Sequence, residues 1–153
     1  FKHFKAIPGI GISTDKNDCL VIDVPYLPLS PIVTRDIVNL ESDDTFQLLG
    51  RRDWVINSGG IKIFPEALEE TLAPHMKFPF FFTGMPDAKL GEKLVLLAEA
   101  PASKKRELIA IARKYLDSNK YHIPKEVFCI PAFKYNSMLK LDRIASRNVA
   151  YAN

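Results

Sequence analysis

Three polar positions lie in segments whose composition fits binding of phosphate or sugar oxygens. Asp36 interrupts an apolar run, and a carboxylate can accept hydrogen bonds from two sugar hydroxyls, although a turn residue or ion-pair partner would look the same. Arg51, in Gly50-Arg-Arg-Asp53, offers a planar fork of donors for phosphate or ribose oxygens, or belongs to a charged interdomain linker. Lys140, flanked by apolar residues, either snorkels from a strand or presents a cation to a phosphate.

Other classes of site lack their usual spacing. His3, His75 and His122 are scattered, with no acid or cysteine at ligand spacing, so we predict no metal site. Neither a GxxxxGK[ST] phosphate loop nor a GxGxxG turn occurs. Cys19 and Cys129 also have no metal-like spacing, and two such cysteines favour a reducing, cytoplasmic environment.

Composition and charge limit the classes of partner. The chain has 153 residues, of which 47% are hydrophobic and 25% charged, as in one globular domain or two small ones. No apolar run is long enough to span a membrane as a helix, and a net charge of +3 is too small to indicate nucleic acid. Residues 1–103 carry 10 basic and 14 acidic groups, whereas residues 104–153 carry 11 and 4. This basic tail is either a solvated face or a surface that attracts a polyanion such as a nucleotide or coenzyme A.

The elements that must position these residues follow from periodicity and turn residues. We expect a strand over 19–25 and two hairpins, which pair 32–38 with 45–49 and 54–57 with 61–64, the second through Ser58-Gly59-Gly60. The other expected elements are a helix at 66–73 after Pro65, strands at 78–83, 93–100 and 126–130 with a loop at 84–91, a helix at 104–117 capped by Ser103, and a helix at 143–150 capped by Asp142. This order predicts an α+β fold, a small mixed sheet with helices packed on it, preceded by a β-rich segment.

Five segments, in order, resemble the motifs of the AMP-forming adenylating enzymes, a superfamily of acyl-CoA synthetases, luciferases and peptide adenylation domains. TRDIV (34–38) resembles TGDL, GRRDWVINSGGIKIFPEALE (50–69) resembles GRxDxxIKxxGxxIxPxEIE, TGMPDAKLGE (83–92) resembles VGxPDxxxGE, YHIPK (121–125) resembles YKVPK, and KLDR (140–143) falls where the family has GKIxR. Three positions depart from the motifs: Arg35 and Leu139 replace glycines, and Asn57 replaces a lysine.

The resemblance implies a portion of a two-step enzyme. A carboxylate would attack the α-phosphate of ATP to give an acyl-adenylate, and a thiol, typically of coenzyme A, would then displace AMP. Residues 1–52 would be the C-terminal end of a large N-terminal domain, which binds most of the ATP and its magnesium ion, and residues 53–153 would be a small mobile domain. Alone, this fragment of an acid–thiol ligase would be inactive.

The resemblance also implies roles for single residues in the adenylating step. Lys140 matches the catalytic lysine, whose ammonium group offsets charge near the reacting carboxylate and the α-phosphate. Asp36 and Arg51 match the residues that hold the ribose hydroxyls of the nucleotide.

A second group of residues matches the domain rotation and the thiol-accepting step. Asp53 matches the hinge between the domains, where a few backbone angles absorb the rotation. Gly59 and Gly60 match the loop beside the channel for the pantetheine arm of coenzyme A. The implied partners are ATP, coenzyme A, a carboxylic acid and the chain's own N-terminal domain.

Three finer interpretations stay open. The stretch INSGGIKI (56–63) and the compact tail resemble o-succinylbenzoate–CoA ligases of menaquinone synthesis. A peptide-type adenylation fragment that loads a carrier protein would share the motifs. A non-catalytic α+β interaction domain with decayed motifs is the third alternative, against which the retained Asp36, Arg51, Asp53 and Lys140 argue.

Overall fold

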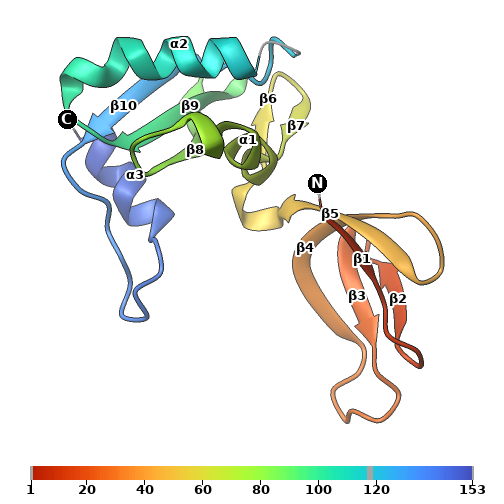
Figure 1. The fold of residues 1–153 in the computed structure, drawn as a ribbon. Coiled ribbons are helices and arrows are strands. Elements are labelled where there is room, and N and C mark those ends of the chain that lie inside the picture. Colours follow the sequence, from red (N-terminus) through yellow and green to blue (C-terminus); the bar gives the residue numbers. More distant parts are fainter. Residues whose placement is uncertain (1, 117–118, 153) are drawn as a thin grey trace. The chain divides into compact units, whose positions relative to one another are not determined.

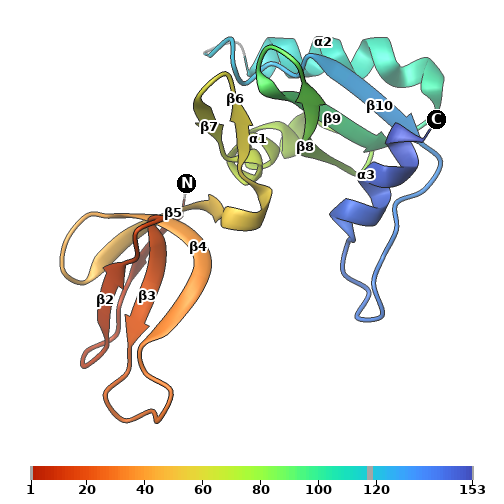
Figure 2. The same ribbon diagram turned by 180° about the vertical axis from the view of Figure 1, so that it is seen from behind.

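A computed structural model describes residues 2–116 and 119–152 and separates them into two compact units (Figures 1 and 2). The first unit ends at Val55 and the second begins at Ile56. That the first unit belongs to a large domain, and that the second moves about a hinge near Asp53, stays a prediction.

The first unit is a five-stranded antiparallel sheet in the order β1-β5-β4-β3-β2. Its elements are β1 (Lys2–Lys5), β2 (Gly11–Thr14), β3 (Cys19–Asp23), β4 (Ile32–Leu40), β5 (Thr45–Arg51) and the 3-10 turn η1 (Arg52–Trp54). The sequence prediction contained β3 and the β4–β5 hairpin but missed β1 and β2. Both are four-residue strands with almost wholly exposed side chains, so no apolar alternation marks them.

The first unit has a small core. Its buried hydrophobic residues are Cys19, Leu20, Val24, Ile37 and Val38. Other apolar side chains are exposed to solvent, with exposed fractions of 59% for Val33, 71% for Tyr26 and 85% for Leu29. An apolar surface of this kind is typical of a part that packs against more protein.

The second unit is a mixed sheet with helices. Its elements are β6 (Ile56–Ser58), β7 (Ile61–Ile63), α1 (Pro65–Leu72), η2 (Ala73–His75), β8 (Phe80–Asp87), β9 (Gly91–Glu99), η3 (Ala102–Lys104), α2 (Lys105–Tyr115), β10 (Glu126–Ile130) and α3 (Arg143–Tyr151). The sheet runs β10-β9-β6-β7, and β8 also pairs with β9. Only the β10–β9 pair is parallel among these described strands, which confirms the predicted mixed sheet.

Helices cover both faces of the central strands. Phe82 and Leu96 join the core beneath α1 and α2, whereas Phe81 and Leu97 join a second cluster with Ala150 of α3. The two helices α2 and α3 accordingly lie on opposite sides of the sheet (Figures 1 and 2). Burial on both faces explains why each strand contains a continuous apolar run, residues 80–82 in β8 and 94–98 in β9, instead of an alternating pattern.

Most predicted elements of the second unit are confirmed, and the differences are local. Trp54 lies in η1, not in a strand, and the loop expected at 84–91 is mainly the end of β8 and the start of β9. Ser103 does not cap α2: it lies inside η3, and the residue before the helix, Lys104, makes no capping side-chain bond. Residue 117, the expected end of that helix, lies outside the described residues. The predicted cap of α3 is confirmed, since Asp142 Oδ1 accepts a hydrogen bond of 2.9 Å from the backbone N–H of Ala145.

Among the helices of the described ranges, none has both the length and the apolar character that crossing a membrane requires.

Candidate functional site

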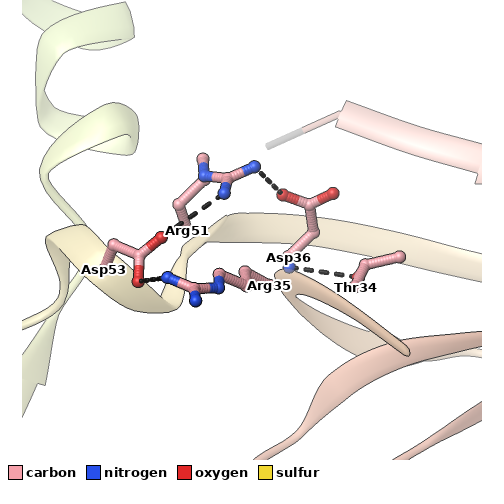
Figure 3. Close-up of polar contacts among 5 residues, drawn as sticks. All are labelled: Thr34, Arg35, Asp36, Arg51 and Asp53. Atoms are coloured by element: carbon pink, nitrogen blue, oxygen red, sulfur yellow. Dashed lines mark hydrogen bonds and ion pairs between the residues drawn. The ribbon is translucent and has the colours of Figure 1, made fainter. Parts of the chain in front are cut away.

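Four charged side chains form a chain of ion pairs at one end of the β4–β5 hairpin (Figure 3). Asp36 and Arg51 are opposite each other in the strand register, and Arg51 Nη1 donates to Asp36 Oδ1 at 3.2 Å. Arg51 Nη2 reaches Asp53 Oδ2 at 3.4 Å, and Arg35 Nη1 donates to Asp53 Oδ1 at 2.9 Å. The sequence-predicted Asp36, Arg51 and Asp53 are therefore neighbours, in alternation with a second arginine.

These side chains stay accessible. Their exposed fractions run from 35% for Asp53 to 69% for Arg35, so the pairs are screened by water and add little to stability. The pairs instead orient the side chains, because each pair holds a guanidinium group or a carboxylate at a defined place on the sheet. Arg35 is the member that sequence reasoning missed: it was noted only as a departure from a motif glycine, and its partner Asp53 lies 18 residues away.

The glycine pair Gly59-Gly60 forms the two-residue turn between β6 and β7. Their φ angles are +60° and +82°, the signs that the favoured hairpin turn requires at both positions. Gly59 N donates to Leu90 O at 2.8 Å, and a Cβ placed on Gly59 would lie 3.2 Å from the side chain of Leu90. A Cβ on Gly60 would meet no atom within 4 Å, so this residue faces open space.

Lys140 lies in the tight loop that joins β10 to α3. Asn136 N donates to Lys140 O at 2.9 Å, and Leu139 N donates to Asn136 O at 3.0 Å. The side-chain oxygen of Asn136 accepts from the backbone N–H of Met138 at 2.9 Å and from that of Lys140 at 3.0 Å. Of the two alternatives left open for Lys140, a snorkelling strand residue does not fit the structure, because the lysine is exposed on a hydrogen-bonded loop.

The stem of this loop is tied to α3. A bridge pairs Tyr135 with Leu141, and Asp142 N donates to Lys134 O at 2.8 Å. Lys134 N in turn donates to Ser146 Oγ, also at 2.8 Å, and Ser146 is fully buried in α3. The backbone at Lys140 is consequently held by hydrogen bonds to Asn136, and the stem of the loop is held by its hydrogen bond to Ser146 of α3.

A partly buried ion pair joins the start of α3 to α1, the helix that carries Glu69. Arg143 Nη1 and Nη2 donate to Glu69 Oε1 and Oε2, each at 2.7 Å, and both side chains are only 18% exposed. Glu69 Oε1 also accepts the backbone N–H of Phe82 at 2.9 Å, and the guanidinium group lies 5.2 Å from the ring centre of Phe81. Burial raises the pKa of Glu69, although the hydrogen bonds and charge of Arg143 act in the opposite direction.

Sequence reasoning assigned no role to this pair, because its members are 74 residues apart. Both residues nevertheless end motif segments, Glu69 at the close of 50–69 and Arg143 at the close of 140–143. A charged residue at the last position of each motif segment was the signal from which a role for this pair could have been inferred.

The predicted site residues thus fall into three groups. Asp36, Arg51 and Asp53 gather in the first unit, and the Gly59-Gly60 turn and the Lys140 loop lie at different ends of the second unit (Figures 1 and 2). Within residues 2–116 and 119–152, no group of three or more histidine, cysteine, aspartate or glutamate residues could hold a metal ion.

The sequence is similar to several curated CoA ligases. It is 32% identical over 111 residues to 3-oxocholest-4-en-26-oate–CoA ligase of Rhodococcus rhodochrous, a match covering 70% of this chain and 20% of that protein. A medium-chain acyl-CoA ligase of Mycobacterium avium is 32% identical over 114 residues, which cover 72% of this chain and 20% of the relative. The chain therefore spans about a fifth of the length of these relatives. No protein-family model matches it.

Solved structures with the same fold carry related names. An AMP-forming acyl-CoA synthetase/AMP-acid ligase II-like protein from Dyadobacter fermentans has a TM-score of 0.61 and 31% identity, over 98% of this chain and 44% of that one. The o-succinylbenzoate–CoA synthetase of Bacillus subtilis, solved with ATP and magnesium, has a TM-score of 0.71 over 94% and 35% of the two chains. Its identity is 21%, so this likeness shows the fold alone.

Proposed function

The chain belongs to the AMP-forming acyl-CoA ligase superfamily and corresponds to a portion of one such ligase, and we propose that the whole protein is a carboxylate–CoA ligase that works through an acyl-adenylate. The observation that carries this proposal is the Lys140 loop. An exposed ammonium group lies on a loop that is closed by backbone hydrogen bonds and by the side chain of Asn136, in the segment that resembles the family's GKIxR motif.

In the proposed first step, a carboxylate oxygen of the acid attacks the α-phosphorus of ATP, and pyrophosphate leaves with the electron pair of the broken P–O bond. Negative charge gathers on the α-phosphate oxygens and on the entering carboxylate in the transition state. The ammonium group of Lys140, placed against these oxygens, would stabilise that charge more than it stabilises the ground state.

The charge cluster of the first unit has a matching role in the proposal. The Asp36 carboxylate accepts hydrogen bonds from the ribose hydroxyls of the nucleotide, and Arg51 keeps that carboxylate in position through the contact of 3.2 Å. Asp53 pairs with both arginines of the cluster, so a rotation near this residue would have to preserve or exchange those pairs. We propose the hinge of the mobile unit here.

In the proposed second step, the thiolate of coenzyme A attacks the carbonyl carbon of the acyl-adenylate, and AMP leaves with the former carboxylate oxygen. The open space beside Gly60 suits the passage of a pantetheine arm close to the backbone. Coenzyme A is favoured over a carrier protein as acceptor because the curated relatives are named as CoA ligases.

We propose an apolar carboxylic acid as the substrate. The relatives are named for 3-oxocholest-4-en-26-oate and for medium- and long-chain fatty acids, all of which combine a carboxylate with a large apolar body. The o-succinylbenzoate interpretation finds support only in a likeness of fold, so menaquinone synthesis is not part of the proposal.

The test is an assay of the full-length parent with ATP, magnesium, dodecanoate and coenzyme A. We expect release of pyrophosphate and AMP and formation of dodecanoyl-CoA. The 153-residue chain, assayed alone, should release no pyrophosphate above a blank, because it contains no phosphate loop. Adenylate formation by this chain alone would contradict the assignment of most ATP binding to the large N-terminal domain. A parent inactive with every acid tested would contradict the proposed reaction.

Replacement of Gly60 is expected to impair the thioester step selectively. Gly60→Leu puts a side chain into the open space and forces a φ of +82° on a residue that disfavours it by about 1–2 kcal/mol. Thioester formation from preformed acyl-adenylate should slow, while pyrophosphate release in the first step stays near the wild-type rate.

Gly60→Ala is the matched control, since it imposes the backbone strain with little added bulk. Equal damage by alanine and leucine would assign the effect to the turn conformation. Greater damage to adenylation than to thioester formation would contradict the proposed pantetheine path.

A further inference from the structure

Leu139 adopts a backbone conformation that its side chain disfavours. Its φ is +57°, in the left-handed region that is unfavourable for most residues with a Cβ, is tolerated better by asparagine and is free of this cost for glycine. The three-residue loop needs a left-handed residue at this point to close the hairpin. The loop's own bonds run through the backbone and the Asn136 side chain, so nothing in its closure requires leucine.

The side chain of Leu139 also gains little from the unit that carries it. It is 86% exposed, and the neighbouring Met138 is 69% and Tyr135 55% exposed. Leucine therefore combines unfavourable backbone strain with unfavourable solvent exposure. An outlier of this kind points to a contact made during function, because binding of an apolar group would recover the free energy lost in the resting fold.

Leu139 is held directly beside Lys140. The Asn136 side chain fixes the backbone of Met138 and Lys140 on either side of Leu139, and Leu139 N is itself bonded to Asn136 O. A cation and an apolar side chain thus sit at adjacent, ordered positions on one loop. The ligand complementary to such a pair carries a negative group next to an apolar body.

We propose that Leu139 is a specificity-determining residue, which packs against the apolar part of the carboxylic acid next to its carboxylate while Lys140 contacts the charged group. This inference rests on the proposed function and adds a substrate preference: acids with bulk close to the carboxylate gain affinity in the adenylating step, and short acids do not. The contact would exist only while the loop is engaged, which accounts for the exposure of Leu139 otherwise.

The test compares dodecanoate with acetate in the adenylation step of the full-length parent, followed as exchange of pyrophosphate into ATP. Leu139→Asn keeps a residue that tolerates the left-handed backbone but removes the apolar side chain. We expect kcat/KM for dodecanoate to fall about tenfold, with kcat/KM for acetate unchanged. Leu139→Met, which restores an apolar side chain, should retain most of the wild-type preference.

Three outcomes with the Leu139 variants would overturn the inference. If Leu139→Asn left kcat/KM unchanged for both acids, there would be no contact with the acid, and an equal loss for both acids would indicate that Leu139 packs on the enzyme's own large domain instead. If Leu139→Gly kept the wild-type preference for dodecanoate over acetate, the backbone conformation and not the side chain would set that preference. A parent that exchanges pyrophosphate with no acid at all would overturn the proposed function itself, and the inference with it.

Discussion

Replacement of Lys140 by alanine in the full-length parent is expected to slow acyl-adenylate formation by about 10²–10³-fold, the usual cost of removing one transition-state charge contact. The loop around Lys140 is stabilised by backbone bonds and by Asn136, none of which involves the lysine side chain. The substitution should therefore leave the loop folded and remove only the cation. Formation of the thioester from preformed acyl-adenylate should stay near the wild-type rate.

The two half-reactions separate this prediction from a general loss of structure. Pyrophosphate release reports the first, and conversion of added acyl-adenylate to acyl-CoA reports the second. Lys134→Ala is the matched control, since Lys134 is another exposed lysine, on the stem of the same loop, whose structural bonds are made by its backbone. Equal harm to both half-reactions by Lys140→Ala, or equal harm from the two lysine variants, would contradict a role for Lys140 in adenylation alone.

Local signals in the sequence were sufficient to predict most of the second unit. The spacing of Leu108, Ile109, Ala112, Tyr115 and Leu116 predicts an apolar face on the helix. Leu108, Ala112 and Leu116 are buried, and the other two are partly buried against the same core. Pro65 marked the first residue of α1, and adjacent glycines marked a two-residue turn. Each of these features is decided by a few consecutive residues, which is why it could be predicted without tertiary information.

Features that depend on distant partners could not be predicted. The strands β1 and β2 owe their form to ladders with β5 and β3, not to apolar alternation of their own. The pairing of Arg35 with Asp53 arises from the way η1 follows β5 in the fold. The left-handed φ of Leu139 was beyond sequence reasoning for another reason, since leucine is a residue for which that conformation is improbable.

The candidate site was likewise predicted only in part. The motif residues were identified from the sequence, but their local geometry was not: that Asp36 faces Arg51, or that Lys140 stands on a loop instead of a strand, follows from strand register and loop closure. The contact between α3 and α1 through Arg143 and Glu69 was not predicted. It also has the largest expected effect on stability.

Replacement of Arg143 by alanine is expected to destabilise the chain by up to about 3–5 kcal/mol, because it leaves the mostly buried carboxylate of Glu69 without its charged partner. The free energy of unfolding from urea titrations measures the effect. Glu69→Ala should cost a similar amount, whereas the double variant should cost less than the sum of the two, since neither charge then remains buried. Lys104→Ala is the control: its pair with Glu107 has the same 2.7 Å distance but is 42% exposed, so at most about 1 kcal/mol is expected.

The Arg143→Ala deficit should also depend on pH. Without the guanidinium group, burial raises the pKa of Glu69 with less opposition than in the wild type. A carboxyl group whose pKa is higher in the folded than in the unfolded state binds more protons when folded, so the stability of the variant falls as pH rises above the unfolded value of about 4.5. The loss relative to wild type should be greater at about pH 8 than at about pH 5. A deficit that stays constant over this range, or one that grows toward acid, would mean that Glu69 is not left as a buried charge and that the pair matters through packing alone.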